Sequence, residues 1–195
     1  MIAGHFGFAA GVKSRERATP LWALMLATVW LDVIFVPLLL MKIETLKPVP
    51  GVSQAYGGNL IYADYTHSLA GAIILSLVLG GFGWLAWGRR SAIVLALVSV
   101  SHWLLDLIVH RGDLPILPGN AGNLPRLGFG LWAYPGLAAG LELLLVVGGS
   151  FLYWRAACDV SREAGRRRLL AHVSGALLLG FGLLVLGMDV GAKAG

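Results

Sequence analysis

The sequence has few charged residues and almost no cysteine. Asp, Glu, Lys and Arg make up only 13% of its 195 residues, whereas soluble domains carry about 25%. Hydrophobic residues make up 57%, and the mean hydropathy is +0.78. The single Cys158 excludes an internal disulfide and a zinc site built from several cysteines. No polar stretch is long enough for a separate soluble domain, so we predict one integral membrane domain over residues 1–195.

The pI is about 9.7, and the sequence holds one basic run, "REAGRRR" (Arg162–Arg168). The basic residues lie in short connections between apolar runs, which is typical of residues that orient a protein in a membrane. We therefore expect membrane lipids, and no nucleic acid, as partners.

Five apolar segments are long enough to cross a bilayer, which takes about 20 residues. They cover residues 21–41, 67–87, 91–110, 131–154 and 169–190. They predict an all-α integral membrane protein with about five transmembrane helices. Residues 2–12 are apolar but too short to span, and basic residues follow them instead of preceding them, unlike a signal peptide. A re-entrant half-helix, buried against protein, is the alternative expected for this segment.

The basic residues alternate between the two ends of the predicted helices. Ten of the fifteen Lys and Arg residues precede the first segment, or separate the second from the third and the fourth from the fifth. This bias predicts a cytoplasmic N-terminus and a C-terminus on the opposite side. The two outer connections, residues 42–66 and 111–130, are long and rich in Gly, Pro and Asn. Such loops either line a site or form a plug without chemistry.

Ionisable side chains within or beside the apolar segments are the most informative feature. Each one costs about 2.5–3.5 kcal/mol at the bilayer centre, so it indicates a functional site by default. The set comprises Asp32, Asp64, His67, His102, Asp106 and His110. The predicted topology places all six in the middle-to-outer half of the membrane, on three different helices.

Spacing along the third segment divides this set. His102 and Asp106, like Asp106 and His110, are four residues apart and share a helix face. His102 and His110 would lie about 12 Å apart along a continuous helix, at about 1.5 Å per residue. They are therefore not expected to bind the same metal ion, and His110 is assigned to a second metal, to an outer position or to the substrate. Asp113, beyond the helix end, is expected to be solvated.

Other polar residues receive simpler interpretations. A single histidine in a membrane helix is often a hydrogen-bonded packing residue, and an Asp–His pair can satisfy itself. His172 is expected to be structural. Glu142 is either a proton-handling group or a partner for another helix, and the sequence leaves both open.

Four short motifs in the first 120 residues carry a family resemblance. Gly4–His5 matches an early G-H, and "LDVIF" (Leu31–Phe35) stands where the family has P-D-x-D-H. "YADYTHS" (Tyr62–Ser68) corresponds to H-R-G-x-T-H-S, and "SHWLLD" (Ser101–Asp106) matches S-H-x-x-x-D in full. The sequence thus resembles the membrane-bound metal-dependent hydrolases, also described as inner-membrane hydrolases linked to the LexA repressor.

The resemblance implies a metal-dependent hydrolase of the bacterial inner membrane. It also implies that His5 is a further metal ligand if the half-helix carries it to the site. One Asp and one His of the second motif are missing, as is the H-R of the third. Either Asp64 and His110 replace the lost groups, or this chain binds fewer metal ions than its relatives, or it has lost catalysis.

We predict a membrane-embedded hydrolase that acts on a lipid-borne ester, amide or phosphodiester. A divalent ion, zinc by preference, would activate a water molecule at a site with three or more His, Asp or Glu ligands. The expected ligands are Asp32, His67, His102 and Asp106, with His5 in addition. Asp64 or His110 would act as general base or carry a proton to the leaving group.

Two other functions stay open. Intramembrane Asp and His residues also form ion relays in transporters, and Pro37 and Pro135 could break helices around a substrate. No internal repeat of the kind seen in many transporters is visible. Alternatively, His67 and His102 could be axial ligands of a haem in an accessory subunit of a larger complex.

Overall fold

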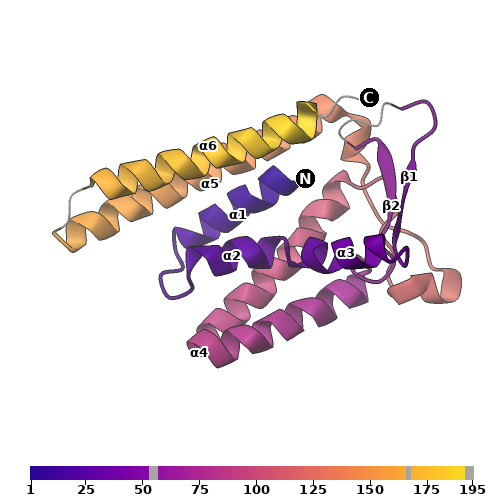
Figure 1. The fold of residues 1–195 in the computed structure, drawn as a ribbon, viewed down its shortest axis with the longest axis horizontal. Helices are drawn as coiled ribbons and strands as arrows, with labels where there is room; N and C mark the ends of the chain where they lie inside the picture. Colours follow the sequence, from indigo (N-terminus) through magenta and orange to yellow (C-terminus); the bar gives the residue numbers. More distant parts are fainter. Residues whose placement is uncertain (53–56, 166–167, 192–195) are drawn as a thin grey trace.

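Helices dominate the fold. The computed structural model describes residues 1–52, 57–165 and 168–191, and Figure 1 shows its elements. The helices are α1 (Ile2–Lys13), α2 (Leu21–Thr28), α3 (Trp30–Leu40), α4 (Leu69–Val109), α5 (Pro135–Glu163) and α6 (Leu169–Gly191). The predicted all-α class is confirmed for these segments. It is incomplete, because two short strands, β1 (Thr45–Pro48) and β2 (Asn59–Tyr62), and two short 3-10 helices, Pro118–Asn123 and Leu131–Ala133, accompany the helices.

Helix α4 folds back on itself as two antiparallel arms. Its backbone leaves helical geometry at Gly88, where φ is +82°, a value that favours glycine. Ser76 donates to Ser99 across the two arms at 2.7 Å. A Cβ on Gly83 would lie 2.6 Å from the Leu95 side chain, so the arms pack closely there. The second and third predicted segments correspond to these arms (Figure 1).

The first apolar segment is broken near its middle. Helices α2 and α3 meet at Val29 and are bent by 50° relative to each other. The break turns the Thr28 carbonyl toward α4, where it accepts a hydrogen bond from His102 at 2.8 Å. Asp32 follows in the first turn of α3. The sequence predicts one continuous helix here, and that expectation is wrong.

Three helices are long and apolar enough to cross a membrane: α4, α5 and α6. The bent pair α2 and α3 passes the same test together, which makes up to four. The sequence predicts about five crossings because it treats the arms of α4 as separate helices. Helix α5 begins at Pro135 and runs to Glu163, so it begins and ends later than predicted.

The connections predicted to share the cytoplasmic side meet at one end of the molecule. Arg17 pairs with Glu163 at 3.0 Å, and Arg90 pairs with Glu16 at 2.8 Å. Burial alone would raise the pKa of Glu16, but its hydrogen bonds from Arg90 and from the backbone N–H groups of Thr19 and Ala18 lower it overall. We call this the basic end.

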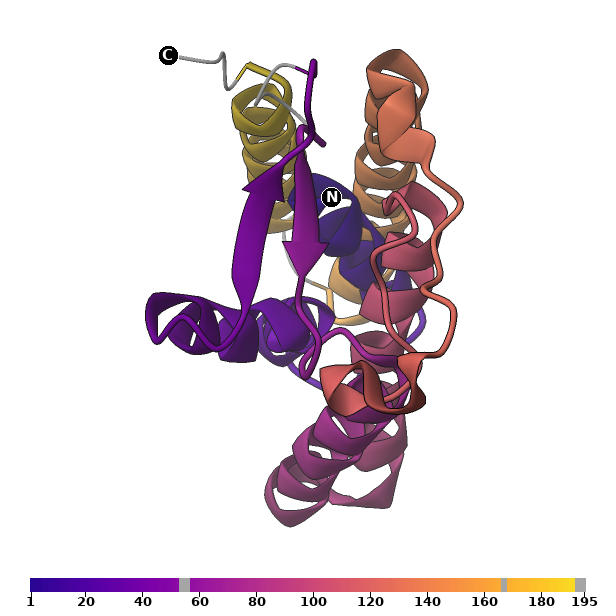
Figure 2. The ribbon, with the colours of Figure 1, turned by 90° about the vertical axis from the view of Figure 1, so that its right-hand side faces the viewer.

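The two long connections meet at the opposite end, which we call the strand end. Strands β1 and β2 form an antiparallel pair with Leu46 opposite Ile61. The second connection holds a bridge between Leu114 and Leu127, and its Pro115 carbonyl accepts the N–H of Leu69 at the start of α4. Figure 2 views the molecule from the strand end, where the hairpin crosses the helix ends.

Helix α1 is a short helix of 12 residues, six of them buried, and its re-entrant position in a membrane stays a prediction. It packs on α5, α2 and α6. Gly7 and Gly149 are in backbone contact, since a Cβ on either would overlap the other helix. This approach draws the start of α1 into the centre of the fold, where Figure 2 shows the N-terminus enclosed by the other helices.

Candidate metal centre

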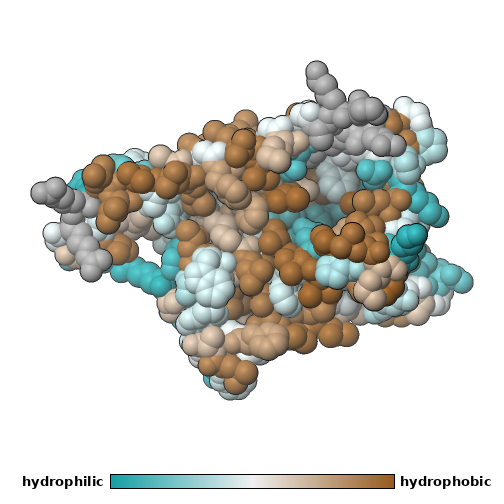
Figure 3. Space-filling view, in the orientation of Figure 1, coloured by the Kyte–Doolittle hydropathy of each residue, from teal (hydrophilic) through white to brown (hydrophobic). Residues whose placement is uncertain are grey.

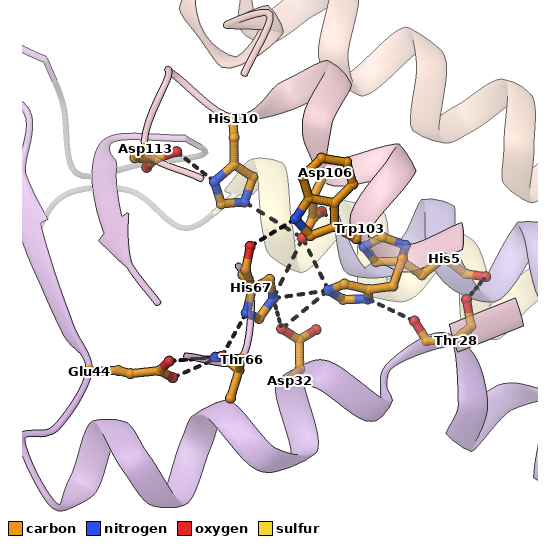
Figure 4. Close-up of polar contacts among 11 residues, drawn as sticks. His5, Thr28, Asp32, Glu44, Thr66, His67, Trp103, Asp106, His110 and Asp113 are labelled. Atoms are coloured by element: carbon orange, nitrogen blue, oxygen red, sulfur yellow. Dashed lines mark hydrogen bonds and ion pairs between the residues drawn. The ribbon is translucent and has the colours of Figure 1, made fainter. Parts of the chain in front are cut away.

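Six predicted site residues and their supporting groups come together beside the first turn of α3. The set of imidazoles and carboxylates comprises His5, Asp32, His67, His102, Asp106 and His110 (Figure 4). All but Asp32 are buried, and the Asp32 side chain is 34% exposed. The His/Asp cluster, as we call it, collects side chains from α1, α3, the turn before α4 and the end of α4.

His67 is held in one tautomer by an outer hydrogen-bond chain. The Thr66 hydroxyl donates to the buried Glu44 carboxylate at 2.9 Å, so its oxygen accepts from His67 Nδ1, also at 2.9 Å. The Nε2 atom of His67 therefore presents a lone pair to the cluster. Glu44 also accepts the backbone N–H groups of Tyr65 and Thr66 at 2.8 Å, which fixes this turn.

His102 is held in the same way by the break between α2 and α3. Its Nδ1 lies 2.8 Å from the Thr28 carbonyl, which can only accept, so Nδ1 carries the hydrogen. The Thr28 hydroxyl donates to the His5 carbonyl at 3.0 Å and ties α1 to this point. His102 Nε2 thus faces the cluster, 3.0 Å from Asp106 Oδ2, as an acceptor in the neutral ring and as a donor in the imidazolium.

His110 lies at the edge of the cluster beside Asp106, as its spacing of four residues predicts. The helix ends at Val109, and His110 adopts an extended conformation with ψ of 148°. Its Nε2 lies 3.6 Å from Asp106 Oδ2, and its Nδ1 donates to Asp113 at 2.7 Å. The N–H of His110 still donates to the Asp106 carbonyl at 2.8 Å, so its separation from His102 along the helix is kept, and neither possible ligand set contains His110. Asp113 was predicted to be solvated, but it is 2% exposed. Its carboxylate accepts hydrogen bonds from His110 Nδ1 and from the Ile61 N–H.

Asp32, His67 and His102 present inner atoms that are spaced like the ligands of one metal ion. His67 Nε2 and His102 Nε2 are 3.2 Å apart. Asp32 Oδ1 lies 3.4 and 3.6 Å from these two nitrogens, and Asp106 Oδ2 lies 3.6 and 3.0 Å from them. Tetrahedral zinc with bonds of about 2.0–2.2 Å separates its ligand atoms by about 3.3–3.6 Å.

When both imidazoles are neutral, all four of these atoms are acceptors, which repel one another unless a proton or a metal ion lies between them. Two neutral imidazoles and two carboxylates carry two negative charges, which one divalent ion balances. The outer partners of His67 and His102 are a hydroxyl and a backbone carbonyl, the kind that orient metal-binding histidines. The buried His and Asp groups can therefore hold a metal ion.

His5 reaches the cluster from α1 and contacts Asp106 on its other oxygen. Its Nε2 donates to Asp106 Oδ1 at 3.2 Å, and its ring stacks on His102 with centroids 3.9 Å apart. His5 Nδ1 has no hydrogen-bond partner among the described residues. His5 groups with His102 and Asp106 as a second possible ligand set, distinct from Asp32, His67 and His102.

Asp64 lies apart from the cluster. Both of its oxygens accept from Arg126, at 2.7 and 2.9 Å, and it does not line the pocket beside the histidines. Asp64 and His67 both precede α4, so they do not share a helix face. Asp64 instead fastens the second long connection to the turn before α4.

A pocket of about 270 Å³ adjoins the cluster. Its polar wall is formed by His5, Asp32, His67, His102, Asp106 and His110, and its apolar wall by Met1, Ile2, Phe35, Val36, Ile61 and Trp132. A larger groove of about 600 Å³ lies at the basic end between α5 and α6, but no His, Asp or Glu lines it. Of these two pockets, the smaller one carries the His and Asp side chains that metal chemistry needs.

Two residues with simpler interpretations have clear partners. Glu142 is fully buried and accepts the backbone N–H of Gly4 at 3.0 Å, so it helps to hold α1 on α5. His172 lies on α6, where its Nδ1 accepts from Trp154 at 3.0 Å, as a structural role predicts.

Sequence reasoning missed the outer partners of the histidines. Glu44 lies in the connection after α3, and Thr66 is part of a recognised motif but has no predicted role. The position of Glu44 directly before a strand is only a weak sequence signal for a role at the site. Its partners, Tyr65 and Thr66, are 21 and 22 residues away, and the hairpin brings them to it.

Comparison with protein-family models, with curated proteins and with solved structures finds no match. The resemblance to the membrane-bound metal-dependent hydrolases therefore stays a prediction that rests on the four short motifs.

Proposed function

We propose that the chain is a membrane-embedded, metal-dependent hydrolase of a lipid-borne or membrane-associated ester, amide or phosphodiester. One observation carries the proposal. Outer partners hold His67 and His102 with their Nε2 atoms 3.2 Å apart and facing two carboxylates. This arrangement of acceptors is stable when a cation joins them, and its spacing suits zinc.

The proposed ligands are His67, His102, Asp32 and Asp106. His5 orients Asp106 through its other oxygen and is assigned an outer position. A bound divalent ion supplies the nucleophile for hydrolysis by lowering the pKa of a coordinated water molecule. Water would take the place of one protein ligand on the ion, and Asp32, whose side chain is 34% exposed, is the most accessible of the four.

His110 is assigned the proton transfer. Asp113 holds its Nδ1 hydrogen at 2.7 Å, which leaves Nε2 to accept the proton released by the attacking water. The hydroxide adds to the carbonyl carbon or phosphorus, the bond to the leaving group breaks, and His110 returns the proton to the leaving atom. Asp64 was also predicted for this role, but it forms an ion pair with Arg126 and is not assigned a part in proton transfer.

The proposed setting is the bacterial inner membrane with five crossings: the bent pair α2–α3, both arms of α4, α5 and α6. The basic end faces the cytoplasm because it carries most of the Lys and Arg residues. The chain then begins inside the protein, α1 runs toward the cytoplasm, and α6 leads to an external C-terminus.

Metal analysis of the purified protein tests the proposal. We expect about one transition-metal ion per chain in the wild type and less than a tenth of that in the variant His102→Ala/Asp106→Ala. The variant His172→Ala/Asp64→Ala removes the same side chains outside the cluster and should keep the metal. Wild-type protein that binds no transition metal, even after zinc is supplied, would refute the proposed function.

Ion transport is a second candidate, and the break at Val29 favours it. Discontinuous helices beside ionisable groups form ion sites in transporters, and Asp32 follows this break directly. Uptake of an ion into proteoliposomes that Asp32→Asn abolishes, without hydrolysis of any lipid, would favour transport. A haem between His67 and His102 is disfavoured, since the porphyrin would have to pass where Asp32 and Asp106 lie.

A further inference from the structure

The pocket beside the cluster is closed toward the strand end. Trp132 is 6% exposed, and its ring lies against His110 with centroids 4.6 Å apart. Arg111 donates to the carbonyls of Trp132 and Gly57 at 2.7 and 3.0 Å and fastens this cover. On the same side the Ile61 N–H is bonded to the buried Asp113 at 2.7 Å. A soluble substrate therefore meets a hydrogen-bonded cover at this end.

The open side of the pocket is apolar. Among the residues that line it, only Ile2 and Val36 are classed as exposed, at 43% and 50%. Ile2 begins α1, and Val36 lies on α3 beyond Asp32. In Figure 3 a hydrophilic hollow lies between the start of α1 and α3, on a face that is mostly apolar. We call the gap between Ile2 and Val36 the lateral opening.

The exposed surface of α3 next to the lateral opening is also apolar. Val33 and Leu40, also on α3, are 41% and 78% exposed. Exposed aliphatic side chains of this kind on a membrane helix face lipid chains. A charged soluble molecule would lose its hydration there, whereas the chain of an amphiphile would not.

The pocket is too small to enclose a whole amphiphile. Sites that bury a complete small ligand usually measure about 300–1,000 Å³, and this one measures about 270 Å³. A polar head can reach the cluster only if the chain attached to it stays outside. The bond nearest to the cluster is then the one at the junction of head and chain.

We propose that the substrate is an amphiphile that enters sideways from the bilayer through the lateral opening, with Ile2 and Val36 against its chain. The bond to be cleaved lies where the polar head joins the chain. The reaction rests on the proposed function, but the route of entry is a property of the folded protein and can be tested without any activity.

The first test measures what surrounds the lateral opening. Spin labels are attached to Ile2→Cys and Val36→Cys, each in a Cys158→Ala background, in phosphatidylcholine nanodiscs. We expect collisions with oxygen to exceed collisions with a water-soluble nickel chelate at both sites. Ala121→Cys, in the exposed loop of the strand end, should show the reverse. Nickel accessibility at Ile2 or Val36 equal to that at Ala121 would overturn the proposed entry route.

The second test uses the cobalt-loaded protein and dodecyl phosphate. We expect the probe to change the visible spectrum of bound cobalt, and Val36→Trp to raise the half-effect concentration about tenfold. The matched control is Val33→Trp, on the same helix but not in the pocket wall. An equal response to inorganic phosphate, or no effect of Val36→Trp, would overturn the entry route. Protein that gives no cobalt spectrum at all would instead count against the proposed metal site.

Discussion

The hydroxyl of Thr66 decides which nitrogen of His67 faces the cluster. It gives its hydrogen to Glu44, so it must accept the hydrogen of His67 Nδ1. Without that acceptor, the neutral ring gains nothing from carrying its hydrogen on Nδ1. Outer partners of this kind usually change metal affinity by about 10–100-fold.

Thr66→Val tests this link with little change of shape. We expect zinc affinity to fall about 10–100-fold, as measured by competition with a chelating dye. Thr66→Ser keeps the hydroxyl and should bind zinc within about twofold of the wild type. If Val and Ser bind zinc equally well, Thr66 only packs against its neighbours and the tautomer assignment is wrong.

At this scale the sequence predicts the inner residues better than the outer ones. His67, His102 and Asp106 stand out because ionisable groups are costly in apolar segments. Glu44 and Asp113 lie in connections, where acids are common, and their burial depends on the hairpin and the chain turn after Val109. His110 keeps the outer position that its distance from His102 along the helix predicts.

At the scale of the elements, close packing of α1 on α5 brings His5 into the cluster. The backbones touch at Gly7 and Gly149, which leaves no room for a side chain. Apolar length indicates that residues 2–12 are too short to span, but it does not say which helix they pack on. The break at Val29 also could not be predicted from the sequence, because no proline or glycine stands there to mark a kink.

Gly7→Ala should separate α1 from α5 and withdraw His5 from Asp106. Its added Cβ would overlap the Leu145 backbone, so we expect a loss of about 1–3 kcal/mol in stability. Gly11→Ala is the matched control, since its nearest contact would be an ordinary 3.7 Å. Thermal unfolding in detergent, with and without zinc, measures both effects. Equal melting temperatures for the two variants would show that this contact is not tight in solution.

At the scale of the whole molecule, the two ends are fastened differently. The basic end is tied by ion pairs between connections, and the strand end by the hairpin, Arg126 and Arg111. The sequence predicts which connections share an end, because the charge bias alternates with each apolar segment. The structure groups the same connections, whereas their cytoplasmic or external orientation stays a prediction.

The tie between Glu16 and Arg90 should depend on pH. The pKa of Glu16 lies below its ordinary value of 4.5, so its charged form stabilises the fold above that pH. This stability is lost as the pH falls through the lowered pKa. We expect the melting temperature of the wild type to fall between pH 5 and pH 3 more than that of Glu16→Gln, each measured in detergent. Parallel curves for the two proteins would contradict the lowered pKa.

The central claim is that His67, His102, Asp32 and Asp106 bind one divalent ion between them. X-ray absorption at the zinc edge of the loaded protein tests it most directly. We predict about four nitrogen or oxygen neighbours at about 2.0–2.2 Å with the scattering of two imidazoles, and one imidazole fewer in His67→Ala. Zinc whose spectrum contains no imidazole, or is unchanged in both His67→Ala and His102→Ala, would contradict the account.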